Sequence, residues 1–444
     1  MQERLVIIGG VAAGMSAAAK ARRTNPDLTI EVYTQDEYIS YAGCGLPYFI
    51  GDKVTEKEQL FARSVEQFRA QNINVIIQTK VTNINPKDKT VTISHVISGE
   101  VKIVTYDKLV IATGARALVP PLEGLDLLGI LPLRNVHDSL SIKEYFANMK
   151  PKKAVIIGGG YIGLEMVENL AEYECEIVLI EASSQILPNM DQNMAQIVTD
   201  YLTSKGITVR INEKVFGFAG DEHVQKVITE QGSIETDFVL LSTGVHPNSE
   251  LASKAGIELG VANAIKVNKR METSLTDIYA AGDCATTTHL VSGEEVYIPM
   301  GTTANKQGKT AGENIAGGSA EFNGVLGTGI AKVMDLEISR TGLNEKECQK
   351  LGIDFTAHTI KSKTTAHFCP AVQDIWIKII ADTNNRRILG GQIVGYKGAA
   401  KRIDVLATAI TSQSTIEDLI DMDLAYSPPF GPVWDPVLVA LNQF

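Results

Sequence analysis

The fold is decided by the stretch Lys153-Ala-Val-Ile-Ile-Gly158-Gly-Gly160-Tyr-Ile-Gly163. A short run of β-branched residues ends in a full G-x-G-x-x-G pattern, and residues 164–173 continue with helical spacing. Strand, tight glycine turn and helix, in this order, open a βαβ unit. Free N–H groups and the dipole at the start of such a helix favour a phosphate group. The stretch therefore predicts a dinucleotide site that includes Gly158, Gly160, Ile162 and Gly163.

An acidic residue, Glu181, ends the strand that is expected over residues 176–181. Its carboxylate can accept hydrogen bonds from both hydroxyls of an adenosine ribose, and it would repel a 2′-phosphate. Residues 182–185 contain no Arg or Lys to receive that phosphate. The pattern favours NADH over NADPH, and the alternative is an acidic strand end without a ligand.

A similar stretch begins at Arg4, about 150 residues earlier. Its turn is Gly9-Gly10-Val11-Ala12-Ala13-Gly14, with Val11 at the middle glycine, and a helical stretch (15–23) and a strand (29–33) follow. Gly9 permits the tight turn, and Gly14 lets the helix pack against the strand. We expect a second pyrophosphate here, beside Gly10 and Ala12, although glycine-rich turns also serve as plain strand–helix corners.

An acid should follow this first turn, on the next strand, to hold ribose hydroxyls. The position where we expect it is occupied by Thr34. Glu31, Asp36 or Glu37 could substitute, or the ribose could be held more weakly.

The composition limits the partners and the compartment. A chain of 444 residues indicates two to four domains, and a net charge of -11 argues against nucleic acid or an anionic membrane as the main partner. No run of 18 apolar residues predicts a spanning helix. The five cysteines lie far apart without a Cys-x-x-Cys pair, so we expect neither a disulfide framework nor a metal site, and a reducing, cytoplasmic compartment fits better.

Further strands are expected beside both turns and after them. The segments 108–112, 238–242 and 277–283 are apolar, and they lead into Thr113-Gly114, Thr243-Gly244 and Asp283. After Gly318 the sequence pattern changes. It predicts strands (375–380 and 388–394) and a helix (400–412), and it contains no glycine-rich phosphate turn. This part should form a domain of its own.

The two turns, the strand end Ala112-Thr113-Gly114 and the segment Thr276-Asp-Ile-Tyr-Ala-Ala-Gly-Asp283-Cys-Ala285 resemble the pyridine nucleotide-disulphide oxidoreductases over nearly the whole chain. The resemblance implies an α/β fold. An FAD domain (1–118 and 247–320) would be interrupted by an NAD domain (119–246) and followed by a C-terminal α+β dimerisation domain (321–444).

The same resemblance implies FAD and NADH as cofactors. It places Asp283 at the FAD ribityl chain and Glu165 near the nicotinamide. Thr113, Gly114 and Gly244, at the strand ends, would also line the cofactor sites.

Ser40-Tyr-Ala-Gly-Cys44-Gly-Leu-Pro47-Tyr-Phe49 resembles the single-cysteine branch of this family, which includes coenzyme A-disulfide reductases and related NADH oxidases. No second cysteine follows nearby, so Cys44 must pair with a small thiol or pass through a sulfenic acid. Pro47 suggests that Cys44 opens a helix, a position that favours the thiolate. Without the resemblance, a buried structural cysteine would be the better interpretation.

The segment Asp423-Leu-Ala-Tyr426-Ser-Pro-Pro-Phe-Gly-Pro-Val-Trp-Asp435 resembles the tail of that branch. The resemblance implies a homodimer in which this tail reaches the neighbouring subunit's site. Tyr426 would donate a hydrogen bond or a proton to the leaving thiolate; the alternative is an aromatic residue packed in a core or an interface.

Coenzyme A carries phosphates, and basic side chains near the cysteine could hold them. Arg22 and Arg63, with Arg23 and Arg69, could form a basic rim, and Ser40 lies close to Cys44 in sequence. Ordinary solvated arginines are an equally good interpretation.

The chain departs from the branch at three places. Ala12 and Ala13 stand where single-cysteine peroxidases carry a histidine, which disfavours a peroxidase. Gly43 replaces an asparagine that is common in coenzyme A-disulfide reductases, and the segment around Cys369 lacks their tyrosine. Tyr426 would then have to suffice, or the acceptor differs. Cys369 could be a second thiol, but a buried bystander is the stronger interpretation.

We therefore expect an enzyme that passes electrons from NADH through FAD to Cys44 and a small disulfide, with coenzyme A disulfide as the first choice. An NADH oxidase would use the same residues and end on oxygen. A reductase for a protein partner would not need Cys44. A non-catalytic flavin-binding or redox-sensing protein fits least, because both nucleotide sites look complete.

Overall fold

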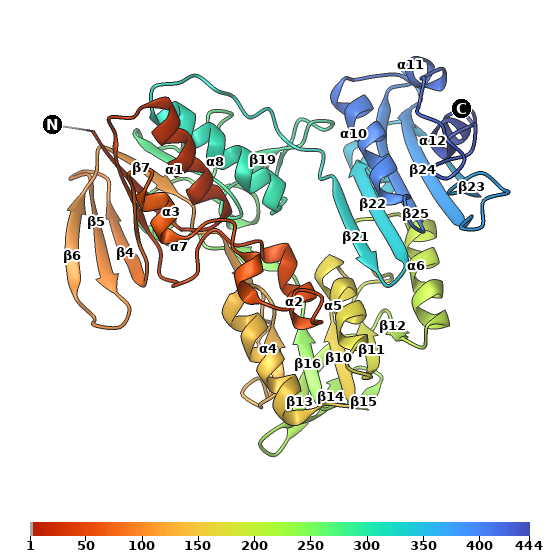
Figure 1. Cartoon of the computed structure of the whole chain (residues 1–444), viewed down its shortest axis with the longest axis horizontal. Coiled ribbons are helices and arrows are strands. Elements are labelled where there is room, and N and C mark those ends of the chain that lie inside the picture. The colour runs from red at the N-terminus through yellow and green to blue at the C-terminus, as the bar shows by residue number, and fades with distance from the viewer. Residues whose placement is uncertain (1–2) are drawn as a thin grey trace.

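Two parallel sheets, each built around one glycine turn, make up most of the molecule, and an antiparallel sheet follows at the C-terminal end (Figure 1). The computed structural model describes residues 3–444. The confirmed fold class is α/β, with two Rossmann-like units and a C-terminal α+β unit.

The first parallel sheet has the strand order β18-β7-β1-β2-β3. Its strands are buried on both faces, because α1 and α8 cover one face and the antiparallel sheet β4-β5-β6 covers the other. The elements of this unit are β1 (Arg4–Ile8), α1 (Ala12–Thr24), β2 (Thr29–Tyr33), α2 (Leu46–Ile50), α3 (Val65–Arg69), β3 (Ile73–Ile76), β4 (Thr79–Asn85), β5 (Thr90–His95), β6 (Val101–Thr105), β7 (Lys108–Ile111), α7 (Glu250–Lys254), β18 (Ile278–Ala280), β19 (Thr287–Thr288), β20 (Glu295–Val296) and α8 (Gly301–Ile315).

Helices α1 and α8 cross at very short distance because glycines face the backbone of α1. A Cβ on Gly308 would lie 2.2 Å from the carbonyl oxygen of Ala13, and a Cβ on Gly312 would lie 2.2 Å from that of Ala17. The alanine-rich sequence of α1 permits the same approach from its side. This crossing fixes the helix that starts at the first glycine turn.

The second parallel sheet has the order β12-β11-β10-β16-β9. Helices α4, α5 and α6 cover one face, and the antiparallel sheet β13-β14-β15 covers the other. The elements are β9 (Ile130–Pro132), α4 (Val136–Met149), β10 (Lys153–Ile157), α5 (Tyr161–Ala171), β11 (Glu176–Ile180), α6 (Gln192–Ser204), β12 (Thr208–Arg210), β13 (Val215–Gly220), β14 (Val224–Thr229), β15 (Gly232–Glu235) and β16 (Phe238–Leu241).

The chain passes twice between these units, through β8 (Ala115–Ala117) and β17 (Val245–Pro247), which pair antiparallel. Both passages lie close to the domain limits that the sequence suggests at 118/119 and 246/247. The limits themselves stay a prediction.

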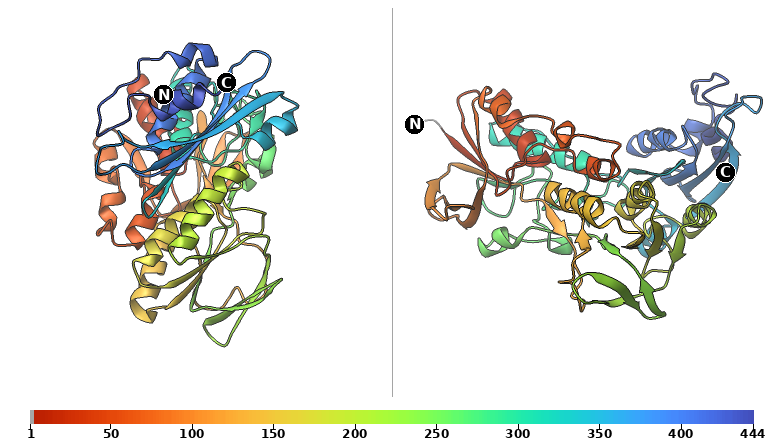
Figure 2. Two further views of the ribbon diagram at one scale, coloured as in Figure 1. Left: turned by 90° about the vertical axis from the view of Figure 1, so that its right-hand side faces the viewer. Right: turned by 60° about the horizontal axis from the view of Figure 1, so that its bottom comes forward.

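The C-terminal sheet is antiparallel, with the order β21-β22-β25-β24-β23, and α10 and α12 pack against it. It lies at the opposite end of the molecule from β4-β5-β6 (Figure 2). Its elements are β21 (Gly329–Val333), β22 (Leu336–Gly342), α9 (Glu345–Leu351), β23 (Phe355–Lys363), β24 (Asp374–Asp382), β25 (Ile388–Gly395), α10 (Ile403–Thr411), α11 (Ile416–Ile420) and α12 (Pro436–Leu441).

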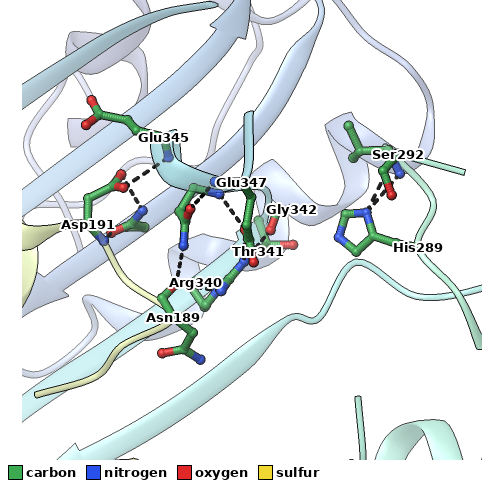
Figure 3. A network of polar contacts seen from close by, with 12 residues as sticks. Asn189, Asp191, His289, Ser292, Arg340, Thr341, Gly342, Glu345 and Glu347 are labelled. Carbon is green, nitrogen blue, oxygen red and sulfur yellow. Dashed lines mark hydrogen bonds and ion pairs between the residues drawn. The ribbon is translucent and has the colours of Figure 1, made fainter. Parts of the chain in front are cut away.

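A buried polar network joins the second unit to this C-terminal domain (Figure 3). The carboxylate of Asp191 accepts hydrogen bonds from the Gln392 amide at 2.7 Å and the Glu345 N–H at 3.0 Å, and it forms an ion pair with Lys378 at 3.0 Å. Arg340 donates to the Asn189 carbonyl at 2.5 Å. These contacts hold the C-terminal domain against the loop that follows β11.

Sequence-based boundaries were close, with one exception in the C-terminal domain. The strand predicted over 29–33 is β2, and the strands predicted over 375–380 and 388–394 are the centres of β24 and β25. The helix predicted over 400–412 is divided, because residues 400–402 form a 3-10 turn before α10 begins at Ile403. The antiparallel sheets β4-β5-β6 and β13-β14-β15 have no counterpart in the prediction.

Candidate active site

The first glycine turn has the geometry of a phosphate cradle. Gly9 has φ +115°, and a Cβ there would lie 2.0 Å from the carbonyl oxygen of Ala112. A Cβ on Gly14 would lie 1.9 Å from the Gly9 carbonyl oxygen. Helix α1 begins at Ala12, and no side chain caps its N-terminus. Its first N–H groups therefore face a narrow space that suits a pyrophosphate.

Thr34 lies against this turn, as the sequence predicts for the ribose position. A Cβ on Gly10 would lie 3.1 Å from the Thr34 Cβ, and Thr34 is buried. Two of the three substitute acids have other partners: Glu31 binds Arg4 at 2.9 Å, and Asp36 contacts His137 at 2.9 Å. Which group holds the FAD ribose stays open.

Asp283 is positioned by an arginine that the sequence analysis missed. Arg134 donates to its carboxylate at 2.5 Å, and a second N–H of Arg134 donates to the Ala115 carbonyl at 3.0 Å. Arg134 directly precedes Asn135, the N-cap of α4, so a basic residue beside a capping residue was the available signal. The carboxylate and the guanidinium face the same region as the first turn's strand ends, which fits an FAD ribityl and phosphate chain.

The strand ends around both cofactor sites are shaped by glycines and a threonine. Thr113 donates its hydroxyl to the Asn248 carbonyl at 2.6 Å. Gly114 and Gly244 have φ +68° and +107°, and the space around a Cβ at either one is open. They leave room for a ligand next to β8 and β17, where the chain passes between the two units.

The second glycine turn repeats the geometry of the first. Gly158 has φ +109°, and a Cβ there would lie 2.4 Å from the Ser242 carbonyl oxygen. A Cβ on Gly163 would lie 2.1 Å from the Gly158 carbonyl oxygen, whereas Gly160 has open space around it. Helix α5 starts directly after Gly160, again without a side-chain cap, and Ile162 lies in its first turn. Both turns therefore combine close backbone packing at two glycines with an uncapped helix N-terminus.

The acid at the end of β11 is held rigidly over this turn. One carboxylate oxygen of Glu181 accepts from the Gly159 N–H at 2.9 Å, and the other accepts from the N–H and hydroxyl of Ser183 at 2.8 and 2.5 Å. Glu181 therefore lies beside the second glycine turn, at the strand end where the sequence pattern predicts ribose recognition.

Helix α5 carries two acids one turn apart, and their environments differ. Burial, and secondarily the charge of Glu168, raise the pKa of Glu165 to about 7. Burial also raises the pKa of Glu168, but hydrogen bonds from Lys53 and Lys332 outweigh it and leave that pKa below its usual range. Glu165 thus exchanges a proton near neutral pH, while Glu168 stays ionised.

Cys44 is exposed, in the segment that connects the first glycine turn to α2. It sits in a 3-10 turn (Gly43–Gly45), and α2 begins two residues later with Pro47 in its first turn. The segment before Cys44 is tied to the first cradle, because the Ser40 N–H donates to the Gly10 carbonyl at 2.9 Å. After Cys44, the Ile50 carbonyl accepts from the hydroxyl of Tyr173 of the second unit at 2.6 Å.

The other four cysteines are less accessible. Cys284 and Cys348 are buried, and Cys175 and Cys369 are half-buried. The thiol of Cys369 donates to the Pro428 carbonyl at 3.1 Å. Of the five, Cys44 alone is exposed, and no described cysteine is disulfide-bonded.

Tyr426 lies in the loop between α11 and α12 of the C-terminal domain, whereas Cys44 lies just before α2 in the first unit. Its side chain is 47% exposed. Arg402 holds this loop by donating to Asp435 at 2.9 Å and to the Phe430 carbonyl at 2.9 Å. The structure therefore does not bring Tyr426 and Cys44 of one chain together.

The two candidate coenzyme A arginines have different surroundings. Arg22 donates to the carbonyls of Pro26, Leu28 and Asn72 at 2.5, 2.7 and 2.6 Å, so its guanidinium already stabilises the chain around α1. Arg63 is exposed, and its guanidinium lies 5.6 Å from the Phe68 ring centre. Their role in binding stays a prediction.

Over residues 3–444, no cluster of three His, Cys, Asp or Glu side chains could hold a metal ion. No helix in the same range is long and apolar enough to cross a membrane.

The sequence matches a protein family over both of its main parts. Residues 3–308 match the pyridine nucleotide-disulphide oxidoreductase family, and residues 329–436 match the dimerisation domain of that family.

Individual relatives cover almost the whole chain. A CoA-dependent NAD(P)H sulfur oxidoreductase of Pyrococcus furiosus is 40% identical over 440 residues, which cover 99% of this chain and 98% of the relative. An NADH oxidase of Methanocaldococcus jannaschii is 36% identical over 99% of this chain and 98% of its own. A coenzyme A disulfide reductase of Staphylococcus haemolyticus is 33% identical over 96% of both chains.

Among solved structures, an NAD-dependent persulfide reductase from A. fulgidus is 40% identical with a TM-score of 0.96, over 99% of this chain and 82% of that one. The two glycine turns, the exposed cysteine and these matches lead to one assignment. The chain belongs to the pyridine nucleotide-disulphide oxidoreductase family, and it is an NAD(P)H-dependent flavin oxidoreductase.

Proposed function

We propose that this enzyme uses NADH to reduce the sulfur–sulfur bond of a small thiol compound, with coenzyme A disulfide or a coenzyme A persulfide as the substrate. The observation that carries the proposal is the position of Cys44. It is exposed, its segment is hydrogen-bonded to the first glycine turn and to the second unit, and no second cysteine follows it on the described turn or on α2. Relatives that act on such compounds, by their names, support the same substrate class.

The sulfur chemistry falls to Cys44. Its thiolate attacks one sulfur of the substrate, the substrate S–S bond breaks, and one thiolate leaves while a mixed disulfide forms on Cys44. Two electrons and one proton then cleave the mixed disulfide. This step returns the Cys44 thiolate and releases the second half of the substrate as a thiol. When bound, the flavin supplies the two-electron link between nicotinamide and sulfur.

The first cradle, with Asp283 and Arg134, would hold the FAD. The second cradle would hold NADH, with Glu181 on the adenosine ribose and Glu165 close to the nicotinamide. We propose NADH rather than NADPH because Glu181 would repel a 2′-phosphate, and its hydrogen bonds to Gly159 and Ser183 keep it in place.

We further propose a homodimer in which Tyr426 of one subunit serves Cys44 of the other. The loop that carries Tyr426 exposes large apolar side chains, including Phe430 (78% exposed), Val433 (70%) and Trp434 (59%). Apolar surface of this kind suits an interface. The matched dimerisation domain, residues 329–436, contains the whole of this loop.

An NADH oxidase is the second candidate, because a relative that is 36% identical carries that name. It would use the same cradles and would pass electrons to oxygen, with Cys44 as a sulfenic acid between turnovers. A reductase for a protein partner is the third candidate, and it would work without Cys44.

The test is NADH consumption by the flavin-loaded protein under strict anaerobiosis, before and after addition of coenzyme A disulfide or polysulfide with coenzyme A. We expect NADH loss only after the addition, and we expect Cys44→Ser to abolish it. Cys175→Ser is the matched control and should behave as wild type, since Cys175 is half-buried and donates to the Pro151 carbonyl. NADH loss that waits for air would instead support the oxidase, and turnover by Cys44→Ser with a protein acceptor would support the third candidate.

A further inference from the structure

One buried carboxylate, that of Glu168, connects three separate parts of the chain. Its Oε1 accepts from the ammonium groups of Lys53 and of Lys332, the latter at 2.9 Å. Its Oε2 accepts from the backbone N–H of Met334 at 2.9 Å. Lys53 follows α2 and the cysteine turn, Glu168 lies on α5, and Lys332 and Met334 belong to the first hairpin of the C-terminal domain.

Glu168 differs from an ordinary surface ion-pair partner. Its side chain is 5% exposed. Glu172, one turn later at the C-cap of the same helix, is 57% exposed, and its carboxylate lies 3.5 Å from the Lys53 ammonium, a longer contact than that of Glu168. A buried carboxylate is stable only when its oxygens are satisfied, and here both oxygens have partners from other segments. Loss of Glu168 would leave two ammonium groups facing one another without a shared anion.

The charge of Glu168 also affects the pKa values of two nearby groups, Glu165 and Tyr48. Its charge adds to burial in raising the pKa of Glu165, which lies one turn earlier on α5. Tyr48 of α2 responds to the same charges: burial first, then Glu165, Glu168 and Cys44, raise its pKa to about 12. The titratable groups that interact with Glu165 are therefore Glu168 on its own helix and Tyr48 of α2, while Lys53 and Lys332 bind Glu168.

We propose that Glu168 is a positioning residue that holds the Cys44 segment, the nicotinamide-side helix and the C-terminal domain in one arrangement and keeps a fixed negative charge beside Glu165. Through Lys332 and Met334, the C-terminal domain thereby contributes to the reaction site of its own chain. The part that concerns Cys44 rests on the proposed function; the part that concerns Glu165 needs only NADH and flavin.

The direction of the effects separates this role from a merely structural one. Glu168→Gln removes a negative charge next to Glu165, so the ionisation of Glu165 should move to lower pH. Lys332→Met keeps the aliphatic stem but removes a positive charge that compensates Glu168, so the ionisation should move to higher pH. General loosening of the fold would lower activity in both variants without opposite shifts.

The experiment measures kcat/KM for NADH against pH with ferricyanide as the electron acceptor, using flavin-loaded wild type, Glu168→Gln, Lys332→Met and Glu172→Gln. The limb of the pH profile that is absent in Glu165→Gln is the one that reports the ionisation of Glu165, because glutamine does not ionise. We expect that limb to shift to lower pH in Glu168→Gln and to higher pH in Lys332→Met. It should stay in place in Glu172→Gln, the matched exposed control.

Unchanged profiles in both variants, or shifts in the same direction, would overturn the proposal. Should Glu168→Gln fail to keep its flavin, as judged from its visible absorbance, Lys53→Met replaces it and should shift the limb to higher pH. Because ferricyanide reduction does not require Cys44, an enzyme that ignores coenzyme A disulfide would still decide the role of Glu168.

Discussion

Glu181 and Gly159 are joined by a 2.9 Å hydrogen bond from the glycine N–H to the carboxylate, so the acid that we propose for ribose recognition is fastened to the second glycine turn. In the proposed function, one rigid unit would recognise both the ribose and the pyrophosphate of the nucleotide. A change at Glu181 should therefore affect the choice of nucleotide more than the fold.

We expect Glu181→Ala to lower the preference for NADH over NADPH, measured as the ratio of kcat/KM values, by roughly 10- to 100-fold, the size of a lost hydrogen bond to a charged group. Removal of the carboxylate also removes its repulsion of a 2′-phosphate. Glu176→Ala, an exposed acid at the start of the same strand, is the control and should leave the ratio unchanged. An unaltered ratio in Glu181→Ala would exclude this residue from ribose recognition.

Two glycines of the second cradle should respond differently to alanine. In Gly163→Ala the new methyl would lie 2.1 Å from the Gly158 carbonyl oxygen, so we expect a loss of roughly 1–3 kcal/mol in the free energy of unfolding. Gly160→Ala has open space, so its stability should match wild type while its KM for NADH rises, because the methyl occupies the path of the pyrophosphate. Denaturant unfolding and steady-state kinetics on both variants check this, and equal stability losses would contradict it.

The raised pKa of Glu165 predicts how stability depends on pH. The folded protein holds this proton up to a pH of about 7, whereas the unfolded chain releases it near the model-peptide value of 4.5. The contribution of Glu165 to stability is therefore fully present below that lower pH and is lost as the pH rises towards 7. Glu165→Gln removes this dependence, so we expect its melting temperature relative to wild type to increase from pH 5 to pH 8.

Melting curves at several pH values for wild type, Glu165→Gln and Glu172→Gln measure this difference. Glu172 is exposed and should show no such trend. A difference between Glu165→Gln and wild type that is constant with pH would show that Glu165 titrates normally in the folded state.

Asp191 and Lys378 form an ion pair with 3% and 4% exposure between the second unit and the C-terminal domain. Asp191→Asn should reduce the free energy of unfolding by about 3 kcal/mol, because a buried ammonium loses one of its two anionic partners. Asp404→Asn, which breaks the exposed pair with Lys401, should change it by no more than about 0.5 kcal/mol. Similar small effects in both variants would mean that water reaches the Lys378 site.

The proposed sharing of sites across a dimer is tested by mixing two inactive variants. Tyr426→Phe should lower coenzyme A disulfide reduction by roughly 10²-fold, the usual size of a general-acid contribution. Refolded mixtures of Cys44→Ser and Tyr426→Phe chains should recover about a quarter of wild-type turnover, because half of the dimers are hybrids with one intact site. No recovery on mixing would place both residues in one subunit's site or remove Tyr426 from the mechanism.

Local sequence patterns were sufficient for the cradles. Gly158, Gly160 and Gly163, followed by a strand that ends in Glu181, can be recognised from their spacing. Gly158 and Gly163 meet steric demands that no other residue meets, and Gly160 leaves open space at the start of the helix. The same holds for Gly9 and Gly14, even though Val11 interrupts the pattern. A redox role for Cys44 was predicted only from a resemblance, and its exposure came from the structure, because nothing in the neighbouring residues distinguishes an exposed cysteine from a buried one.

Tertiary structure decided what depends on residues far apart in the chain. Arg134 reaches Asp283 across 149 positions, and Lys332 reaches Glu168 across 164, and no periodicity in the sequence records such pairs. The sequence by itself determined where the two glycine turns form, since such a turn is a local object of strand, glycines and helix. Only the folded chain determined which charges surround Glu165 and Cys44, because electrostatic interactions act through space and the domains that supply these charges meet only after folding.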